Sequence, residues 1–372
     1  MKIVPRGLWP LLFMLVCLSA GAQNPYGEIV PVAEQTLLVI GRPLSLGEQA
    51  DVANVVLHRS GDTLYLIDTG DTESFREHLR AAVERLRPFR RVVLINTNGH
   101  VDHIGNNDLA YALGAERVDH FISVNDVPTL RDNIRYFAES FERVAPYVDL
   151  GKSPTAYSND LVSLFSPVAP NMETVRVLES LPLEALEIGE QIFPGWRFGE
   201  DLYVMKSHGR TAGQVVVYIP AAKLLHLSDE TNSYFPPWHD SSAFNTINLL
   251  LRVREVLDGE GVKFLSDSRH HRLYDDPRAQ RALVETLIAN YFAFDRLVNS
   301  ALSANPEGLT LDELAARFEA DPALQIGSDL DVDRNPLFIR IKLLKKLTEV
   351  GAVPDGPPAP DTRFVRGLKS AS

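Results

Sequence analysis

Histidine and aspartate crowd into one short stretch of this chain, residues 100–103. His100 and Asp102 alternate, and His103 follows directly. Imidazole nitrogens and carboxylate oxygens are donors from which proteins build sites for divalent metals, and a tight loop after a strand can aim them at a common point. Since the chain holds only ten histidines, chance rarely produces this density. The stretch therefore predicts a metal centre.

The first 22 residues differ from the rest of the chain. Lys2 and Arg6 precede an apolar run over residues 8–18, and Ala20-Gly21-Ala22 supplies small residues for cleavage before Gln23. This pattern is typical of a signal peptide over residues 1–22. The alternative, an uncleaved anchor, is disfavoured because a spanning helix needs about 20 apolar residues. We therefore expect a periplasmic or secreted protein with no stable membrane insertion after cleavage.

Composition restricts which residue types can bind a metal and which classes of partner the protein can have. Cys17 is the only cysteine and lies in the expected signal peptide, so the mature chain has no thiol ligand. Any metal must then be held by histidine, aspartate or glutamate. The net charge of −12 argues against nucleic-acid binding, which requires clustered basic residues to neutralise phosphates.

The elements around the stretch alternate between strand and helix, which favours an α/β layered fold. A helix is expected from Phe75 to Leu86, with Asp71 or Thr72 as its N-cap. A further helix is expected over 243–257. Apolar and β-branched runs predict the strands, which are 36–40, 53–58, 64–67, 92–97, 202–206, 214–219, 224–227 and 262–265.

Three segments stand apart from this alternation. Residues 125–180 read as an insertion, which fits either an active-site cover or plain packing. The pattern of residues 286–353 predicts a small helical module. Two interpretations of this module are open, a winged-helix-like appendage or a dimerisation element. Thr310 and Glu313 form a capping-box pattern in it. The proline-rich segment 354–372 is expected to be a loose tail.

The stretch from Ile95 to Asn106 resembles the THxHxDHxG signature of the metallo-β-lactamase superfamily. Further segments resemble family motifs in the same order: Leu66-Ile67-Asp68-Thr69-Gly70, His208-Gly209-Arg210-Thr211-Ala212-Gly213, Leu227-Ser228-Asp229 and Arg269-His270-His271. The resemblance covers about residues 30–285 and implies a four-layer αββα sandwich, which we assign to residues 23–285.

The resemblance also implies two metal positions that share Asp229. At the first, Asn98 and Arg210 replace histidines, which leaves His100 and Asp229. Arginine has no lone pair to offer a metal. The second position keeps its ligands, which are Asp102, His103, Asp229 and either His270 or His271. We therefore expect one strong site, occupied by zinc, with iron or manganese also suited to the ligand types.

The same resemblance suggests catalytic roles. Asp102 or Asp229 would orient the hydroxide, and His100 would act as general base or acid. Arg210 would either offer a bidentate fork to an anionic group or pair with Asp229. His208 is a further candidate ligand after a local shift. The aromatic residues after Asp229, which are Tyr234, Phe235 and Trp238, fit either a pocket wall or simple packing.

The leading interpretation is an exported metal-dependent hydrolase. Its small-molecule substrate would carry an ester, lactone, lactam, sulfate ester or phosphate ester. Two alternatives remain open. One is lactam hydrolysis of the β-lactamase type, suggested by Asn98 alone. The other is a degenerate binding or sensor protein, which Asn98 and Arg210 favour and the intact second position opposes.

Overall fold

The computed structural model describes residues 25–42, 51–165, 174–231, 235, 237–259, 261–321, 324 and 335–367. The expected signal peptide, Cys17 and Tyr234 lie outside the described residues. Within the described part, no helix combines the length and the apolar character needed to cross a membrane.

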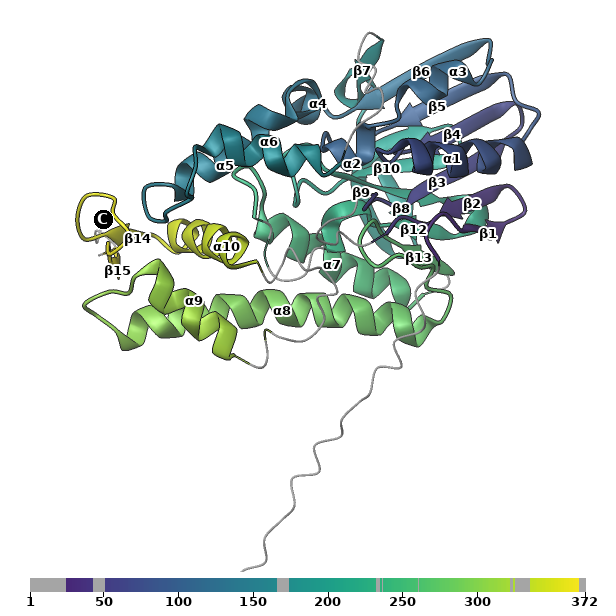
Figure 1. Ribbon diagram of the computed structural model, residues 1–372. Coiled ribbons are helices and arrows are strands. Elements are labelled where there is room, and N and C mark those ends of the chain that lie inside the picture. The colour runs from purple at the N-terminus through teal and green to yellow at the C-terminus, as the bar shows by residue number, and fades with distance from the viewer. Residues whose placement is uncertain are drawn as a thin grey trace, which may run out of the picture.

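The first sheet has seven strands in sequence order (Figure 1). They are β1 Ile29–Ala33, β2 Thr36–Val39, β3 Val55–Ser60, β4 Thr63–Ile67, β5 Arg91–Ile95, β6 Arg117–Ile122 and β7 Val175–Val177. The first four pair antiparallel, and β4, β5, β6 and β7 pair in parallel. Parallel pairing brings the carboxyl ends of β4 and β5 to the same edge of the sheet.

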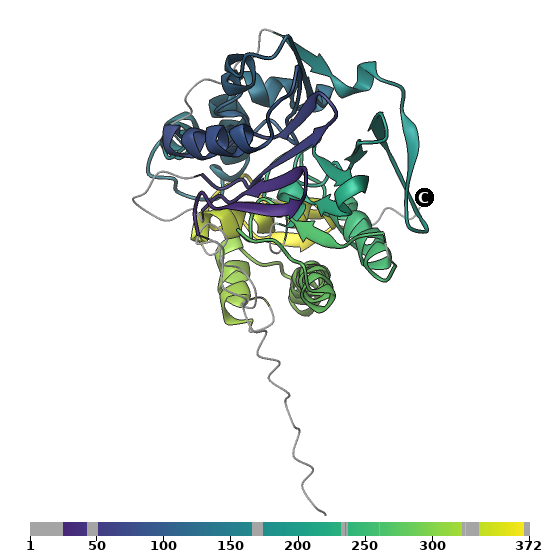
Figure 2. The ribbon, with the colours of Figure 1, turned by 90° about the vertical axis from the view of Figure 1, so that its right-hand side faces the viewer.

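The second sheet has six strands in the order β13-β12-β11-β10-β9-β8. They are β8 Glu184–Ile188, β9 Gln191–Phe198, β10 Leu202–Lys206, β11 Val215–Ile219, β12 Leu224–His226 and β13 Phe264–Ser266. Only β12 and β13 pair in parallel. In Figure 2 these teal-to-green strands lie beside the purple-to-blue strands of the first sheet.

Side chains alternate between the two faces of a strand, so a strand buried on both faces contributes to two hydrophobic cores. On β5, Val93 and Ile95 pack between the sheets with Val204 and Val217 of the second sheet. Val92 and Leu94 face the opposite way, onto helices. This period of two is what a strand buried on both faces requires.

Helices cover the outer face of each sheet. α1 (Glu73–Arg85) and α3 (Asp108–Ala112) pack on the first sheet, and α7 (Ala243–Leu257) and α8 (Pro277–Ala304) pack on the second. Thr72 is the N-cap of α1 and accepts from the N–H of Phe75 at 3.2 Å. The expected αββα order is thus confirmed.

The expected insertion forms three helices beside the sheets. They are α4 (Val127–Arg131), α5 (Asn133–Val144) and α6 (Pro154–Ser163). Asp132 separates α4 from α5, because it has a φ of −152° and caps α5 by accepting from the N–H of Arg135. A short helix α2 (Val101–Ile104) precedes this region.

The C-terminal module joins α8 to α9 (Leu311–Ala320) and α10 (Pro336–Glu349). The capping box of Thr310 and Glu313 is present at α9. A hairpin of β14 (Ala352–Pro354) and β15 (Phe364–Arg366) follows. The expected C-terminal helical module is thus present, and a two-stranded hairpin follows its helices.

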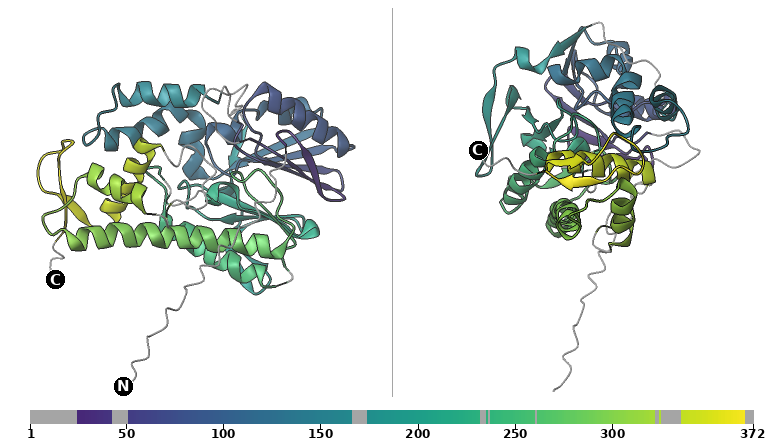
Figure 3. Two further views of the ribbon diagram at one scale, coloured as in Figure 1. Left: turned by 60° about the horizontal axis from the view of Figure 1, so that its bottom comes forward. Right: turned by 90° about the vertical axis from the view of Figure 1, so that its left-hand side faces the viewer.

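Two expected boundaries differ from the structure. The expectation of a loose tail over residues 354–372 is wrong for its described part, which ends at residue 367. There β15 pairs with β14, and Phe364 is buried and bridges to Leu309. Arg363 adds a hydrogen bond of 2.8 Å to the carbonyl of Gly308. The boundary at residue 285 falls inside α8, which runs without a break under both the second sheet and the module (Figure 3).

Candidate functional site

The carboxyl ends of β4 and β5 supply the first half of the site. Asp68 follows β4 with a positive φ of 62°. Its carboxylate accepts the backbone N–H of Thr97 at 2.7 Å and the Thr97 hydroxyl at 2.6 Å. These bonds fix the loop after β5, from which α2 begins.

Asp102 and His103 lie on α2 and meet Asp229 from the second sheet. His103 Nε2 is 3.1 Å from Asp229 Oδ1 and 3.6 Å from Asp102 Oδ2. One ligand atom from each residue lies within 4.8 Å of the others, and all three side chains are buried. Among the described residues these three form the group with the spacing of a metal site.

Asp229 reaches this point through a turn after β12. It lies in the 3-10 helix η4 (Ser228–Thr231), where Ser228 has a positive φ of 49°. The Ser228 hydroxyl lies 2.5 Å from the Thr97 hydroxyl, so the two loops are bonded directly. Asp229 is therefore held in register with α2 although more than one hundred residues separate them.

Charge pairing dominates this buried cluster. Burial lowers the pKa of His103, but Asp229, Asp68 and Asp102 outweigh burial and raise its pKa well above its usual value. Burial raises the pKa of Asp229, but the nearby Arg269 and His103 hold its pKa well below its usual value. Both ring nitrogens of His103 face carboxylates, since Nδ1 is 2.8 Å from Asp68. Without a metal, this arrangement favours the imidazolium form.

Arg269 enters between two of the three candidate ligands. Its Nη1 donates to Asp102 Oδ2 at 3.2 Å, and its Nη2 donates to Asp229 Oδ2. Sequence reasoning missed this residue. The available signal was its place directly before His270 and His271 in the segment that resembles the last ligand loop.

Asp267 shapes that loop so that the arginine faces the cluster. Its Oδ1 accepts the N–H groups of Arg269 and His270, both at 2.7 Å, and its Oδ2 lies 2.8 Å from His270 Nδ1. His271 has a φ of 45° and donates from Nε2 to the carbonyl of Val52 at 3.0 Å. As a correction to the expected ligand set, the structure places neither histidine with the three donors.

Arg210 also lies beside Asp229. Its Nε is 3.7 Å from Asp229 Oδ2, and its guanidinium carbon is 5.2 Å from the centre of the Trp238 ring. Its backbone N–H donates to Glu230 at 3.3 Å. Of the two expected roles, pairing with Asp229 is present in the structure.

His100 is near the cluster but belongs to an aromatic pocket. Its Nδ1 lies 3.8 Å from Asp229 Oδ2. Tyr136, Phe137 and Trp238 pack on the ring with centroid distances of 5.1, 5.3 and 5.8 Å. Burial lowers the pKa of His100, and the nearby Arg210 lowers it further, although Asp229 opposes both. Trp238 thus walls the site, whereas Phe235 packs on Phe294 of α8.

The two-metal arrangement does not fit these residues. Asn98 donates to Gln214 at 3.1 Å and accepts the N–H of His100 at 2.8 Å, so its amide holds the loop. Arg210 and Arg269 both add positive charge beside Asp229 Oδ2. A single ion fits the donor set, because two carboxylates and one imidazole converge and catalytic sites commonly use three protein ligands.

Comparison with known proteins agrees with this fold. The profile of the metallo-beta-lactamase superfamily matches residues 49–260. No curated protein matches the chain.

Solved structures share the fold at low sequence identity. A metallo-beta-lactamase family protein from Thermus thermophilus is 18% identical with a TM-score of 0.58, covering 91% of this chain and 100% of its own. A beta-lactamase domain protein from Burkholderia ambifaria is 17% identical with a TM-score of 0.54, covering 94% and 98%. A sec-alkylsulfatase from Pseudomonas sp. is 19% identical with a TM-score of 0.50, covering 86% and 49%.

Proposed function

This chain belongs to the metallo-β-lactamase superfamily, and we propose that it is an exported hydrolase that uses one divalent metal ion, with zinc expected. The observation that carries the proposal is the convergence of Asp102, His103 and Asp229 at one point. A divalent ion with three protein ligands and an open position lowers the pKa of a bound water toward neutrality. Iron or manganese also suits this ligand set.

His103 is prepared for ligation by Asp68. When Nδ1–H donates to the Asp68 carboxylate at 2.8 Å, Nε2 carries the lone pair and faces Asp102 and Asp229. A carboxylate behind a ligating histidine fixes its tautomer and ring orientation. Asp68 is thus a positioning residue in this proposal.

Arg210 is suited to hold an anionic part of the substrate. Its guanidinium stacks on Trp238 and remains within 3.7 Å of Asp229, at the wall of the same buried site. Such a fork binds carboxylate, sulfate or a developing oxyanion in a bidentate manner. His100, whose lowered pKa favours the neutral ring, would hold or move a proton beside Asp229.

The substrate classes we propose are esters, lactones, lactams, sulfate esters and phosphate esters of small molecules. The positive charge of Arg210 favours a substrate with an anionic group near the scissile bond. A sec-alkylsulfatase shares the fold, which makes a secondary alkyl sulfate one probe of the panel.

Elemental analysis beside this substrate panel tests the proposal. Purified mature protein should hold about one metal ion per chain and hydrolyse at least one class. Asp229→Asn should lose both metal and hydrolysis, while Asp258→Asn, an exposed aspartate at the end of α7, should keep both. A content near two ions would contradict the single-site assignment.

A second candidate is a binding protein that retains the fold without a metal. The contact of Arg269 with both Asp102 and Asp229 favours it, because the guanidinium already neutralises these carboxylates. Metal content near zero, together with no hydrolysis across the panel, would support this candidate over the hydrolase.

Export and assembly are further parts of the proposal. Residues 1–22 support cleavage before Gln23 and a periplasmic or secreted location. N-terminal sequencing of the protein from a periplasmic fraction tests both. A homodimer through the C-terminal helices is supported by Phe292, which is 44% exposed on α8, and light scattering would measure the mass.

A further inference from the structure

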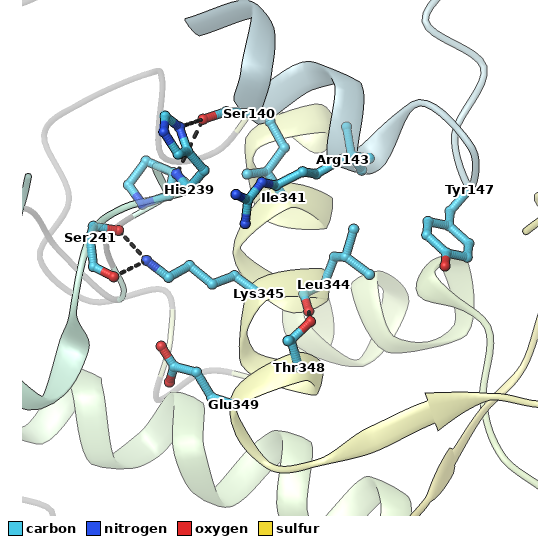
Figure 4. A pocket seen from close by; sticks show the side chains of 12 residues that line it. Ser140, Arg143, Tyr147, His239, Ser241, Ile341, Leu344, Lys345, Thr348 and Glu349 are labelled. Atoms are coloured by element: carbon cyan, nitrogen blue, oxygen red, sulfur yellow. Dashed lines mark hydrogen bonds between the residues drawn. The ribbon is translucent and has the colours of Figure 1, made fainter. Parts of the chain in front are cut away.

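A cavity of about 520 Å³ lies between α5, α10 and the loop over residues 237–241 (Figure 4). Its volume falls in the range of small-molecule pockets. Its lining contains none of the three candidate metal ligands and neither arginine beside them. The cavity is therefore distinct from the metal centre.

The loop over residues 237–241 separates the cavity from the metal centre. The Trp238 ring packs against His100 and Arg210 on one side. The Trp238 carbonyl faces the other side and accepts from Lys345 Nζ at 2.8 Å. Tyr136 completes the partition, with its ring 4.9 Å from that of His239.

Two cationic side chains of the lining, Arg143 and Lys345, point toward this loop (Figure 4). Lys345 donates to the carbonyl and hydroxyl oxygens of Ser241 as well as to Trp238. Burial lowers the pKa of Lys345 to about 8, so the ammonium form prevails at neutral pH. Arg143 forms no hydrogen bond or ion pair with the described part of the chain, and Figure 4 shows its guanidinium directed across the cavity. Among the described residues nothing occupies its fork, which we assign to a ligand.

The remaining polar groups give the cavity two ends. Ser140 lies near Arg143 and bonds through its hydroxyl to His239 Nδ1 at 3.1 Å. Burial lowers the pKa of His239. Glu349 lies at the opposite end in Figure 4, beyond Lys345. An anionic group is therefore favoured at the end with Arg143 and disfavoured at the end with Glu349.

Apolar side chains form the wall between these ends. Val144 comes from α5, and Ile341 and Leu344 come from α10. Val144 and Ile341 belong to the hydrophobic core that joins the insertion to the C-terminal module, and Leu344 packs against this core. This wall suits an alkyl chain, whose transfer from water to apolar surroundings is favourable.

We propose that this cavity binds an organic carboxylate with an alkyl chain. The Arg143 fork holds the two carboxylate oxygens, the charge of Lys345 adds attraction, and the chain lies along Val144, Ile341 and Leu344. Such a bidentate pair of hydrogen bonds fixes the orientation of the carboxylate and strengthens its binding. Lys345 also donates to the backbone carbonyl of Trp238. A ligand bound in the cavity would therefore affect Trp238, which lies at the wall of the metal centre.

Calorimetric titration of mature protein with octanoate tests the proposal. Binding should saturate at one octanoate per chain, and octan-1-ol, which has the same chain without the charge, should bind at least about tenfold more weakly. Arg143→Met should weaken octanoate binding by a similar factor. Arg135→Met is the matched control, because Arg135 lies on the same helix, is 78% exposed and does not line the cavity.

Three outcomes would overturn the proposal. The first is octanoate binding that does not saturate. The second is equal weakening by Arg143→Met and Arg135→Met. The third is weakening by Arg210→Gln without weakening by Arg143→Met, which would assign the anion to the metal centre. Weakening by Lys345→Met, together with altered Trp238 fluorescence on titration of the wild type, would support it. None of these results depends on metal content or on hydrolysis.

Discussion

The guanidinium of Arg269 donates to the carboxylate of Asp102 at 3.2 Å, inside a cluster that is almost fully buried. The same side chain donates to Asp229 through its other terminal nitrogen. One cation thus spans two of the three candidate metal ligands. A divalent ion at this point would share its carboxylates with a fixed positive charge, which weakens its binding.

Arg269→His should strengthen metal binding. The substitution removes the competing charge and places an imidazole near the same carboxylates. We expect zinc affinity to rise at least about tenfold, which corresponds to about 1.4 kcal/mol. Titration against a competing chelator measures this change. Arg278→His, at an exposed position on α8, should leave the affinity unchanged, and equal affinities for all three proteins would contradict the competition.

Arg269→Met should destabilise the metal-free protein. Removing one partner of a buried ion pair leaves Asp102 and Asp229 without their shared cation, at a cost of about 3 kcal/mol. Urea unfolding in the presence of a chelator measures the loss. Zinc should restore part of this stability, since the ion replaces the missing charge. A loss that zinc does not reduce would argue that Arg269 acts through packing alone.

Arg210→His alone should not create a second metal position. Asn98 would still be engaged with Gln214 and with the N–H of His100. Combined with Asn98→His, the substitution restores histidines at both altered places of the first position. We expect elemental analysis to give about two ions per chain for the double variant and no gain for the single one. A gain in the single variant would show that Asn98 is not limiting.

Acid should destabilise the fold through buried histidines. His120 is fully buried beside Asn96, and burial lowers its pKa to about 3. The unfolded chain takes up a proton near pH 6.5 whereas the folded chain does not, so stability is lost as pH falls below about 6.5. Between pH 7 and pH 5 this residue accounts for about 2 kcal/mol by that linkage.

His120→Gln keeps a donor for Asn96 and removes this titration. Its unfolding free energy should fall about 2 kcal/mol less than that of the wild type between the two pH values. Some slope will remain, because burial also lowers the pKa values of His226 and His271 to about 4. His78→Gln, at a partly exposed position on α1, is the control. Identical slopes in the wild type and His120→Gln would contradict the assignment.

The C-terminal hairpin should contribute measurably to stability. Phe364 is 3% exposed, and its ring packs 5.2 Å from that of Tyr147. Phe364→Ala should therefore cost about 3 kcal/mol in urea unfolding. Val353→Ala on the paired strand, where the side chain is 47% exposed, should cost much less. A negligible effect of both would indicate that residues beyond 350 behave as the loose tail suggested by their proline content.

The sequence predicted the parts of the site that depend on local pattern. The β-branched run before Asn96 predicted β5, and the density of donors after it identified Asp102 and His103. Their meeting with Asp229 required the family resemblance, because no local pattern relates residues so distant in the chain. By residue type alone a histidine is the better metal ligand, so the sequence favoured His270 or His271 in the last loop. The structure differs because the Asp267 carboxylate accepts the backbone N–H groups of Arg269 and His270 and thereby turns Arg269 inward.

Other differences have equally physical causes. β9 was not predicted, since Pro194 and Gly195 interrupt its apolar pattern. The hairpin of the C-terminal module was hidden by a proline-rich turn between its strands. In both cases pairing with a neighbouring strand overrides a weak local preference.

The uninterrupted helix α8 has a mechanical consequence. Its 28 residues give a rod of about 42 Å, and the same rod belongs to the sandwich at one end and to the C-terminal module at the other. A swinging motion between these parts would have to bend or break a helix in its middle. In the proposed function, access of a substrate to the buried aspartates would therefore require rearrangement of loops such as the one that carries Trp238, while the module moves with the sandwich as one rigid piece.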